Sequence, residues 1–417
     1  MDEILQTEDF LHKKAGAFRR SFGALYFRNF RMLWLGNIFI GLGQGADNIA
    51  IGWLMIEMTK SPFLVGAAYF CRMFPLLVLP PVTGVIADRL DRRKFLIIAN
   101  SLFTVTGLTV TTLVLTGLIT VWQILLGTLI AGIAFAMVST ARQSLMPSLV
   151  SRTRLQNAVA VYAISQNTSA FFAPGLAGMM ISLAGIAAGF FLGAIGYAGA
   201  LFSAILMRAP KVDTADPKSV WEDLKIGLRY VRDHKSLLAV LMLCSSMAFF
   251  GMSYQSMLAV LAQQVFHVDP AGYGFMGLSL GGGALAGSAL LAIWGRIPNR
   301  GLVAIISLMV FSLAIVALSL TRSIYVAYAV LPIVGLSNAF ARALANALAL
   351  HEVPDFLRGR VMSIYIMTFG LQPLGSLTMG AIAQATNAPL AVGFGGVVTA
   401  LSALAIAIFI PELRRLK

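Results

Sequence analysis

Ionisable side chains inside long apolar stretches are the residues of this sequence whose types and spacing could do chemistry. Asp47 lies in IGLGQGADNIAIGW, and Arg72 lies in YFCRMFPLL. Gln44 and Asn48 flank Asp47 at helical spacing, so we expect the three side chains to form one polar wedge on a helix. A carboxylate and a guanidinium in such surroundings can bind a charged solute, exchange a proton, or pair with each other.

A second polar set lies in SNAFARALANALAL, where Asn338, Arg342 and Asn346 recur every four residues. This spacing places the three side chains in a single stripe along a helix. We expect the stripe to face a polar cavity and to attract an anionic or oxygen-rich solute. The alternative is that Arg342 pairs with the end of a neighbouring helix.

The common catalytic and metal-binding patterns are absent from the sequence. The four histidines are scattered, and neither HExxH, GxSxG nor a Walker-type phosphate loop occurs. Cys71 and Cys244 both lie in apolar stretches and provide neither a disulfide framework nor a metal-ligand spacing. We therefore expect neither an enzyme nor an ATP-driven pump, with no metal and no cofactor.

The composition indicates that membrane-spanning helices position these polar residues. The 417 residues are 58% hydrophobic and only 12% charged, with a mean hydropathy of +0.84, whereas soluble domains carry about a quarter charged residues. Residues 101–137 contain no charge, and this run is too long for one span of about 20 residues. The first thirty residues lack an apolar core, so we expect no cleaved signal peptide.

Apolar runs between charged or Gly/Pro/Asn punctuation predict twelve spans. We place them at 31–57, 62–87, 95–117, 120–142, 157–183, 186–208, 236–265, 271–294, 301–320, 324–350, 360–384 and 388–410. Residues 1–30 form an N-terminal arm, 31–208 and 236–410 form two six-helix bundles, and 411–417 form a tail. The linker at 209–235 contains an amphipathic helix that we expect on the cytoplasmic membrane surface, with an apolar face formed by Trp221, Leu224, Leu228 and Val231.

The distribution of basic residues predicts the orientation. All but four of the 31 Lys and Arg fall on the side of the termini; Lys60 and Arg322 lie on the opposite side, and Arg72 and Arg342 lie within spans. This bias places both termini in the cytoplasm of a multi-pass inner-membrane protein. The net charge of +14 and the pI of about 10.1 are explained by these loops, so we expect no nucleic-acid partner.

The two halves of the sequence resemble each other. A shift of 207 residues lays WGRIPNRG, after span 8, onto ADRLDRRK, after span 2. The same shift pairs Asp47 and Asn48 with Tyr254 and Gln255, which makes these two residues candidates for the cavity. They are weaker candidates, because a neutral Tyr and Gln are tolerated in many helix interfaces. The repeat predicts two pseudo-symmetric bundles, an organisation that transporters use for alternating access.

Helix depth suggests that Asp47 and Arg72 are neighbours. Each lies about sixteen residues from the cytoplasmic end of its span, which corresponds to roughly 24 Å at 1.5 Å per residue. An ion pair at this depth would keep Asp47 ionised, and a substrate or a proton could compete for it. The alternative is a static pair that fixes two helices.

The stretch GVIADRLDRRK resembles the signature that the major facilitator superfamily carries between spans 2 and 3. Its matching residues are Gly84, Asp88, Arg89, Arg92 and Arg93, whereas Asp91 stands where the signature has glycine. The resemblance implies the major facilitator fold and a cytoplasmic gate, with Arg358 and Arg360 before span 11 as contacts and Asp88 as a helix cap. For the basic residues, the alternative is that they only set orientation and bind anionic lipid.

Further stretches are similar to the branch that contains the enterobactin exporter and the macrolide efflux proteins. They are FRNFRMLWLG, GWLMIEMTKSP, GLRYVRDHKSLL and VPDFLRGRVMS. The resemblance implies a monomeric, proton-coupled exporter of a small amphipathic molecule, either a siderophore or a drug-like compound. Two departures concern coupling: AFFAPGLAG in span 5 has Ala173 and Ala177 where the antiporter motif has glycine, and GTLIAGIAFAMVST in span 4 lacks an arginine.

Other readings of the sequence stay open. A lipid or lysolipid transporter, or a solute transporter with another coupling ion, would have the same pattern of spans. A membrane receptor or scaffold without flux is the alternative from a different class.

Overall fold

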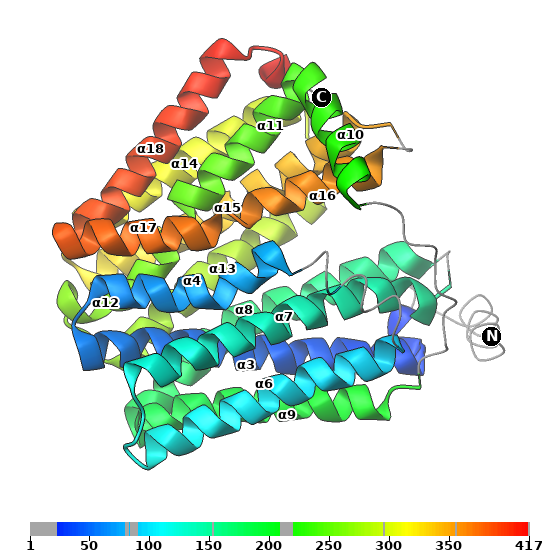
Figure 1. Cartoon of the computed structure of the whole chain (residues 1–417). Coiled ribbons are helices and arrows are strands. Elements are labelled where there is room, and N and C mark those ends of the chain that lie inside the picture. Colours follow the sequence, from blue (N-terminus) through cyan, green and yellow to red (C-terminus); the bar gives the residue numbers. More distant parts are fainter. Residues whose placement is uncertain are drawn as a thin grey trace. The chain divides into compact units, whose positions relative to one another are not determined.

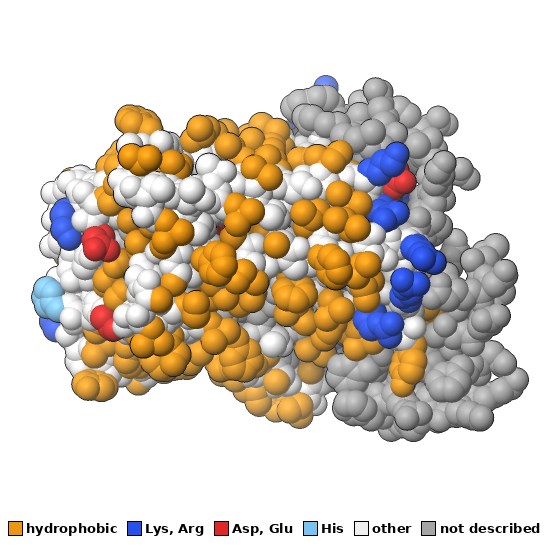
Figure 2. All heavy atoms as spheres, turned by 90° about the horizontal axis from the view of Figure 1, so that it is seen from below, with side chains coloured by type: hydrophobic (Ala, Val, Ile, Leu, Met, Phe, Trp, Pro, Cys, Tyr) orange, Lys and Arg blue, Asp and Glu red, His pale blue; other side chains and the backbone are white. Residues whose placement is uncertain are grey.

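The computed structural model describes residues 23–79, 83, 91–151, 154–208, 220–294, 297–354 and 357–415. This part of the chain is built from helices and short loops, and it contains no strand (Figure 1). Nine helical segments within it are long and apolar enough to cross a membrane, and Pro62–Val78 is a shorter apolar helix. The face drawn in Figure 2 is largely apolar in its middle, and its Lys and Arg side chains lie toward the two ends, with more of them at one end.

A helix lies at the position of each predicted span. In the first half of the chain these are α3 (Arg28–Thr59), α4 (Pro62–Val78), α6 (Arg92–Leu115), α7 (Val121–Leu149), α8 (Leu155–Ala184) and α9 (Ile186–Leu206). In the second half they are α11 (Lys235–Ser246) with α12 (Tyr254–Gln264), α13 (Pro270–Trp294), α14 (Arg300–Leu320), α15 (Ile324–His351), α16 (Arg358–Phe369) with α17 (Gln372–Ala385), and α18 (Ala388–Phe409). Short 3-10 turns occupy Gly23–Tyr26 and Leu413–Arg415.

Helices α7 and α4 lie at the positions of predicted spans 4 and 2. Helix α7 continues to Leu149, seven residues beyond the predicted end of span 4. The residues after Val78 that complete the predicted span 2 lie largely outside the described part of the chain.

Contacts divide the chain into two compact units. The first unit comprises Met1–Ala50 and Val78–Pro217, and the second comprises Ile51–Leu77 and Lys218–Lys417. The boundary therefore falls within α3, after Ala50. The last turns of α3 and nearly all of α4 pack with the helices of the second half. The sequence repeat thus assigns residues 51–77 to the first half of the chain, whereas the contacts assign them to the second unit.

Close helix crossings organise the first unit. A Cβ atom on Gly196 of α9 would lie 2.6 Å from both the backbone nitrogen of Gly43 and the carbonyl oxygen of Phe39 on α3. Only glycine permits this approach, as is common where helices meet in a membrane. On its other side α9 packs against α6, where the rings of Phe103 and Tyr197 stack with centroids 4.5 Å apart.

In the second unit, α15 packs against α13 and α14, and α14 also packs against α18. Gly283 on α13 has no space for a side chain, because a Cβ there would overlap the carbonyl oxygen of Pro332 on α15. In the same way, a Cβ on Gly335 of α15 would overlap the carbonyl oxygen of Leu280 on α13. The two helices therefore cross at backbone contact.

The linker helix α10 (Val220–Asp233) forms where an amphipathic helix is predicted. It packs against α16, since a Cβ on Gly227 would lie 2.9 Å from Ile364. The Tyr230 hydroxyl donates a hydrogen bond to the Glu352 carbonyl at 3.2 Å. On the predicted apolar face, Val231 is buried and Leu228 is exposed, while the side chains of Trp221 and Leu224 lie outside the described set.

Candidate transport and gating residues

The Asp47 carboxylate lies inside the first unit and is hydrogen-bonded to a tyrosine that is not among the predicted candidates. Asp47 is 6% exposed, and its Oδ2 accepts a hydrogen bond from the Tyr197 hydroxyl at 2.6 Å. Gly193 makes the approach possible, because a Cβ there would lie 2.5 Å from Asp47 Oδ1. A signal for Tyr197 was present in the sequence: it is a polar aromatic residue that follows the glycines of GAIGYAG at helical spacing.

Arg72 is buried on α4, in the second unit, whereas Asp47 belongs to the first. The predicted pair between them therefore stays a prediction. Gln44 and Asn48, which flank Asp47 on α3, are both half-buried. The polar wedge on α3 thus has one buried carboxylate between two partly accessible amides.

The predicted stripe on α15 is accessible. Arg342 and Asn346 are exposed, and Asn338 is half-buried. The Arg342 guanidinium lies 4.9 Å from the ring centroid of Phe369, a cation–π contact, and the Tyr365 hydroxyl donates to the Arg342 carbonyl at 3.2 Å. A guanidinium this deep in a span is costly against lipid, so physical chemistry favours a hydrated path along this side of α15.

Two helices of the second unit are interrupted at places that touch each other. Between α11 and α12 the chain forms a π-helical turn at Met247–Gly251, and α16 is separated from α17 at Gly370 and Leu371. The interruptions are in contact, because a Cβ on Gly375 would overlap the carbonyl oxygen of Phe249. Irregular backbone at membrane depth is tolerated where it is buried in protein or lines a cavity, and such breaks often mark transport sites.

Polar side chains gather at these interruptions. The Gln372 side-chain amide donates to Gln255 Oε1 at 3.5 Å, and the Ser253 hydroxyl donates to the Phe249 carbonyl at 2.6 Å. The predicted candidate Gln255 is half-buried, whereas Tyr254 is buried and meets the ring of Phe311 edge-on. Gln255 is therefore the member of the Tyr254 and Gln255 pair that is accessible to a solute.

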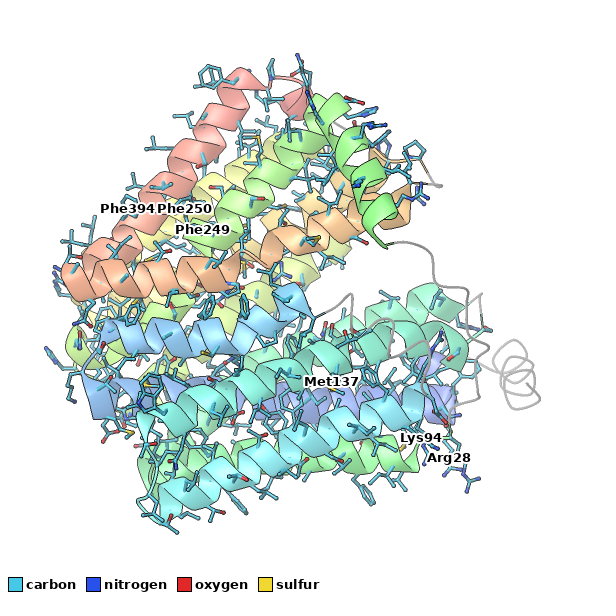
Figure 3. All side chains as sticks on the ribbon, viewed as in Figure 1. Arg28, Lys94, Met137, Phe249, Phe250 and Phe394 are labelled. Atoms are coloured by element: carbon cyan, nitrogen blue, oxygen red, sulfur yellow. The ribbon has the colours of Figure 1, made fainter. Side chains whose placement is uncertain are left out.

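Aromatic rings extend from the same place toward α18 (Figure 3). The rings of Phe249 and Phe250 meet edge-on with centroids 4.7 Å apart, and Phe250 meets Phe394 in the same manner at 6.4 Å. These contacts secure the π-helical turn against the body of the second unit.

The expected cytoplasmic gate is described only in part. Gly84, Asp88 and Arg89 lie outside the described residues. The described cap of α6 is Asp91, whose Oδ1 accepts from the backbone nitrogens of Arg93 at 2.9 Å and Lys94 at 3.4 Å. The residue that departs from the superfamily signature is thus the N-cap of the following helix, a position that favours aspartate over most residues.

The other gate residues lie at helix starts. Arg92 is half-buried in the first turn of α6, and Arg93 donates from its guanidinium to the Ile205 carbonyl near the end of α9 at 2.6 Å. Arg358 is exposed and Arg360 is half-buried in the first turn of α16, which is the helix that α10 covers.

A buried arginine on α7 was missed. Arg142 stands at the predicted end of span 4 and was counted with the cytoplasmic residues, but it is only 6% exposed. It donates to the Tyr162 hydroxyl at 2.6 Å and to Asn37 Oδ1, and the Tyr162 hydroxyl donates to the same Asn37 oxygen at 2.8 Å. The continued apolar pattern after Arg142, with Leu145 and Leu149, is the signal that could have revealed it.

The helical architecture, with interrupted helices and an accessible polar stripe, is typical of a multi-pass membrane transporter. The family model described as transmembrane secretion effector matches residues 20–416. The chain belongs to this family, which is part of the major facilitator superfamily, and its fold is the major facilitator fold.

Several characterised proteins are similar over most of their length. The staphyloferrin A transporter of Staphylococcus aureus is 25% identical over 86% of this chain and 89% of its own. Macrolide efflux protein A of Streptococcus pyogenes is 24% identical over 85% and 89%, and the multidrug efflux pump Tap of Mycolicibacterium fortuitum is 24% identical over 90% and 94%.

Solved structures share the fold at low identity. A peptide transporter of the POT family, crystallised with sulfate, matches with a TM-score of 0.76 at 13% identity, covering 98% of this chain and 99% of its own. The nucleoside transporter NupG matches with a TM-score of 0.71 at 15% identity, covering 91% and 99%.

Proposed function

We propose that the protein is a secondary transporter that exports a small amphipathic molecule across the inner membrane by alternating access. The observation that carries the proposal is the exposed stripe of Asn338, Arg342 and Asn346 on an otherwise apolar helix. A stripe of this kind is stable in a membrane protein only along water or a polar solute. Relatives that handle a siderophore, macrolides or several drugs support export of small molecules.

Contacts between α3–α4 and the second half of the chain support alternating access. The Ser61 hydroxyl donates to Gln384 Oε1 at 2.8 Å, and the rings of Trp53 and Tyr273 stack with centroids 6.3 Å apart. With cytoplasmic termini, these contacts lie at the outer end of the spans. They are the contacts that an outward-open state would have to release.

The proton gradient is the driving force that we propose. Asp47 is the buried carboxylate through which a proton would act, because it lies beside the Tyr197 hydroxyl and between two partly accessible amides on α3. The protein would act as a monomer in this scheme, with the N-terminal arm and the C-terminal tail in the cytoplasm.

A flux measurement tests the function. Purified protein in proteoliposomes with an imposed proton gradient is expected to move a radiolabelled macrolide, and Arg342→Gln is expected to lower the rate by about tenfold, the effect of roughly 1.4 kcal/mol. Arg414→Gln, at an exposed arginine of the tail, is the matched control and is expected to transport normally. Absence of gradient-dependent flux with a macrolide, a siderophore and a cationic dye would contradict the proposal.

A further inference from the structure

Arg142 is a buried cation whose hydrogen-bond partners are all neutral. Its contacts are Asn37 Oδ1 and the Tyr162 hydroxyl, and Asn37 in turn donates to the Ser165 hydroxyl at 2.6 Å. Its Nε atom is buried without a hydrogen-bond partner. Within the described residues no carboxylate forms an ion pair with it, so its charge is not compensated by the protein there.

A cavity lies against this guanidinium. It is enclosed by α3, α6, α7 and α9, and Arg142 and Asn100 are its most polar lining residues, together with Ser203. Asn100 is 2% exposed, and its Oδ1 is also buried without a hydrogen-bond partner. The cavity leaves about 10 Å³ in which the centre of a water-sized guest can lie, so it admits one small guest, either a water molecule or a monatomic anion.

The charge of the guest decides whether it can compensate the buried Arg142 guanidinium. A buried guanidinium without a counter-charge is costly, and a water molecule would supply a hydrogen bond but no charge. A small anion supplies both. The Asn100 side-chain amide can turn to present its NH2 group to the same anion, because the amide has a donor and an acceptor end of nearly equal size.

A second arginine marks the approach to the cavity. Arg93 lies on α6, on the same helical face as Leu96 and Asn100, and its Nε is likewise buried without a partner. Arg28 and Lys94 lie at this end of the first unit (Figure 3). Among the described residues at this end of the first unit, the basic Arg28, Arg93 and Lys94 outnumber the acidic Asp91, so this end attracts anions.

We propose that the first unit binds one small monovalent anion, of the size of chloride, between Arg142 and Asn100, and that the anion enters past Arg93. The site lies wholly within one unit and does not depend on which molecule the protein transports. It would make the stability of the unit, and through it the rate of transport, depend on the anion in the cytoplasm.

The test compares chloride with gluconate, which is too large for the cavity, at equal ionic strength. The midpoint of thermal unfolding of the purified full-length protein is expected to rise saturably with chloride, by roughly 2–4 °C or more. Asn100→Asp places a resident carboxylate beside Arg142, so it is expected to be stable in gluconate and to lose the response to chloride. Asn387→Asp makes the same change at an exposed helix cap and is expected to keep the full response.

Bromide gives an independent measurement. A crystal grown in bromide is expected to show one anomalous peak between Arg142 and Asn100. The proposal is overturned if wild-type protein unfolds at the same temperature in chloride and gluconate, which would mean that the cavity holds water. It is also overturned if Asn100→Asp and Asn387→Asp respond to chloride alike, or if bromide produces no peak at Arg142.

Discussion

The Tyr197 hydroxyl donates a hydrogen bond to Asp47 Oδ2 at 2.6 Å and thereby joins α9 to α3. Neither residue has room to move, because Gly43 and Gly193 bring the two helix backbones into contact around them. A buried carboxylate is stable only when hydrogen bonds or charges replace its lost water. Tyr197 is therefore a positioning residue for the carboxylate that we propose as the coupling group.

Tyr197→Phe removes this donor and leaves the ring stack with Phe103 in place. We expect a loss of stability of about 1–3 kcal/mol, the cost of removing a hydrogen-bond donor from a buried carboxylate. Thermal unfolding measures the loss, and flux at fixed proton gradient measures its effect on coupling. Tyr325→Phe, at an exposed tyrosine, is the control, and an equal loss in both variants would refute the role of Tyr197.

Ser61 and Gln384 contact each other at the end of the spans that we propose to be the outer one. In a protein whose Cys71 and Cys244 have been replaced by serine, Ser61→Cys with Gln384→Cys is expected to form a disulfide under mild oxidation. Transport should stop in the oxidised protein and return after reduction, because the contact at 2.8 Å must open in each cycle. Unchanged flux in the cross-linked protein would show that this contact does not open.

Gly66 lies where α4 crosses α17, and a Cβ there would lie 2.6 Å from the Ser376 carbonyl. We expect Gly66→Leu to prevent this packing and to shift the protein toward an open outer end. The measure is the rate at which a membrane-impermeant maleimide labels a cysteine introduced at Ser61, which should rise at least about tenfold. Gly117→Leu, at a loop glycine with open space around it, tests for a general effect, although its positive φ adds local strain.

Asp91 caps α6, and its replacement by alanine should cost about 0.5–2 kcal/mol. Asp91→Gly restores the residue of the superfamily signature and should cost only a few tenths of a kcal/mol. Asp91→Ser retains a capping oxygen and serves as the control. Hydrogen exchange at the amides of Arg93 and Lys94 would locate the effect, and equal protection in all three variants would contradict the assignment of the cap.

Gly375 has no space for a side chain because it faces the π-helical turn. Gly375→Val is expected to displace Phe249 and to cost several kcal/mol, since a Cβ would overlap the Phe249 carbonyl oxygen and the Ser253 hydroxyl. Gly359→Ala is the matched control, because nothing lies near Gly359 in the exposed first turn of α16. Thermal unfolding distinguishes them: the control should be neutral or slightly more stable.

The positions of the helices could be predicted from the sequence because apolar runs and punctuating residues are local signals. Helix α9 begins at Ile186, the predicted start of span 6, and α13 ends at Trp294, the predicted end of span 8. The apolar span of α7 ends at Arg142, as predicted, but the helix continues to Leu149 and Arg142 is buried. Its burial could not be predicted, because the neutral partners Asn37 and Tyr162 come from α3 and α8.

The contacts of the candidate site could be predicted only in part. The stripe on α15 follows from a spacing of four residues, whereas its orientation toward a cavity stays a prediction. The partner of Asp47 could not be found in this way, because a tyrosine 150 positions away is brought close by glycines whose role is visible only when α3 and α9 meet. The π-helical turn could not be predicted either, because no local sequence pattern around Met247 indicates it.

Helix α3 is continuous from Arg28 to Thr59, yet its residues up to Ala50 pack with the first unit and those from Ile51 onward pack with the second. A rod that is built into two bodies transmits force between them. If one body turns, the rod must bend near residue 50 or its far end must detach from Tyr273. The smaller of the two energies, that of bending the helix and that of detaching its end, therefore sets a minimum resistance to the turn. Substitutions near residue 50 that ease bending should raise its speed without touching any bound molecule.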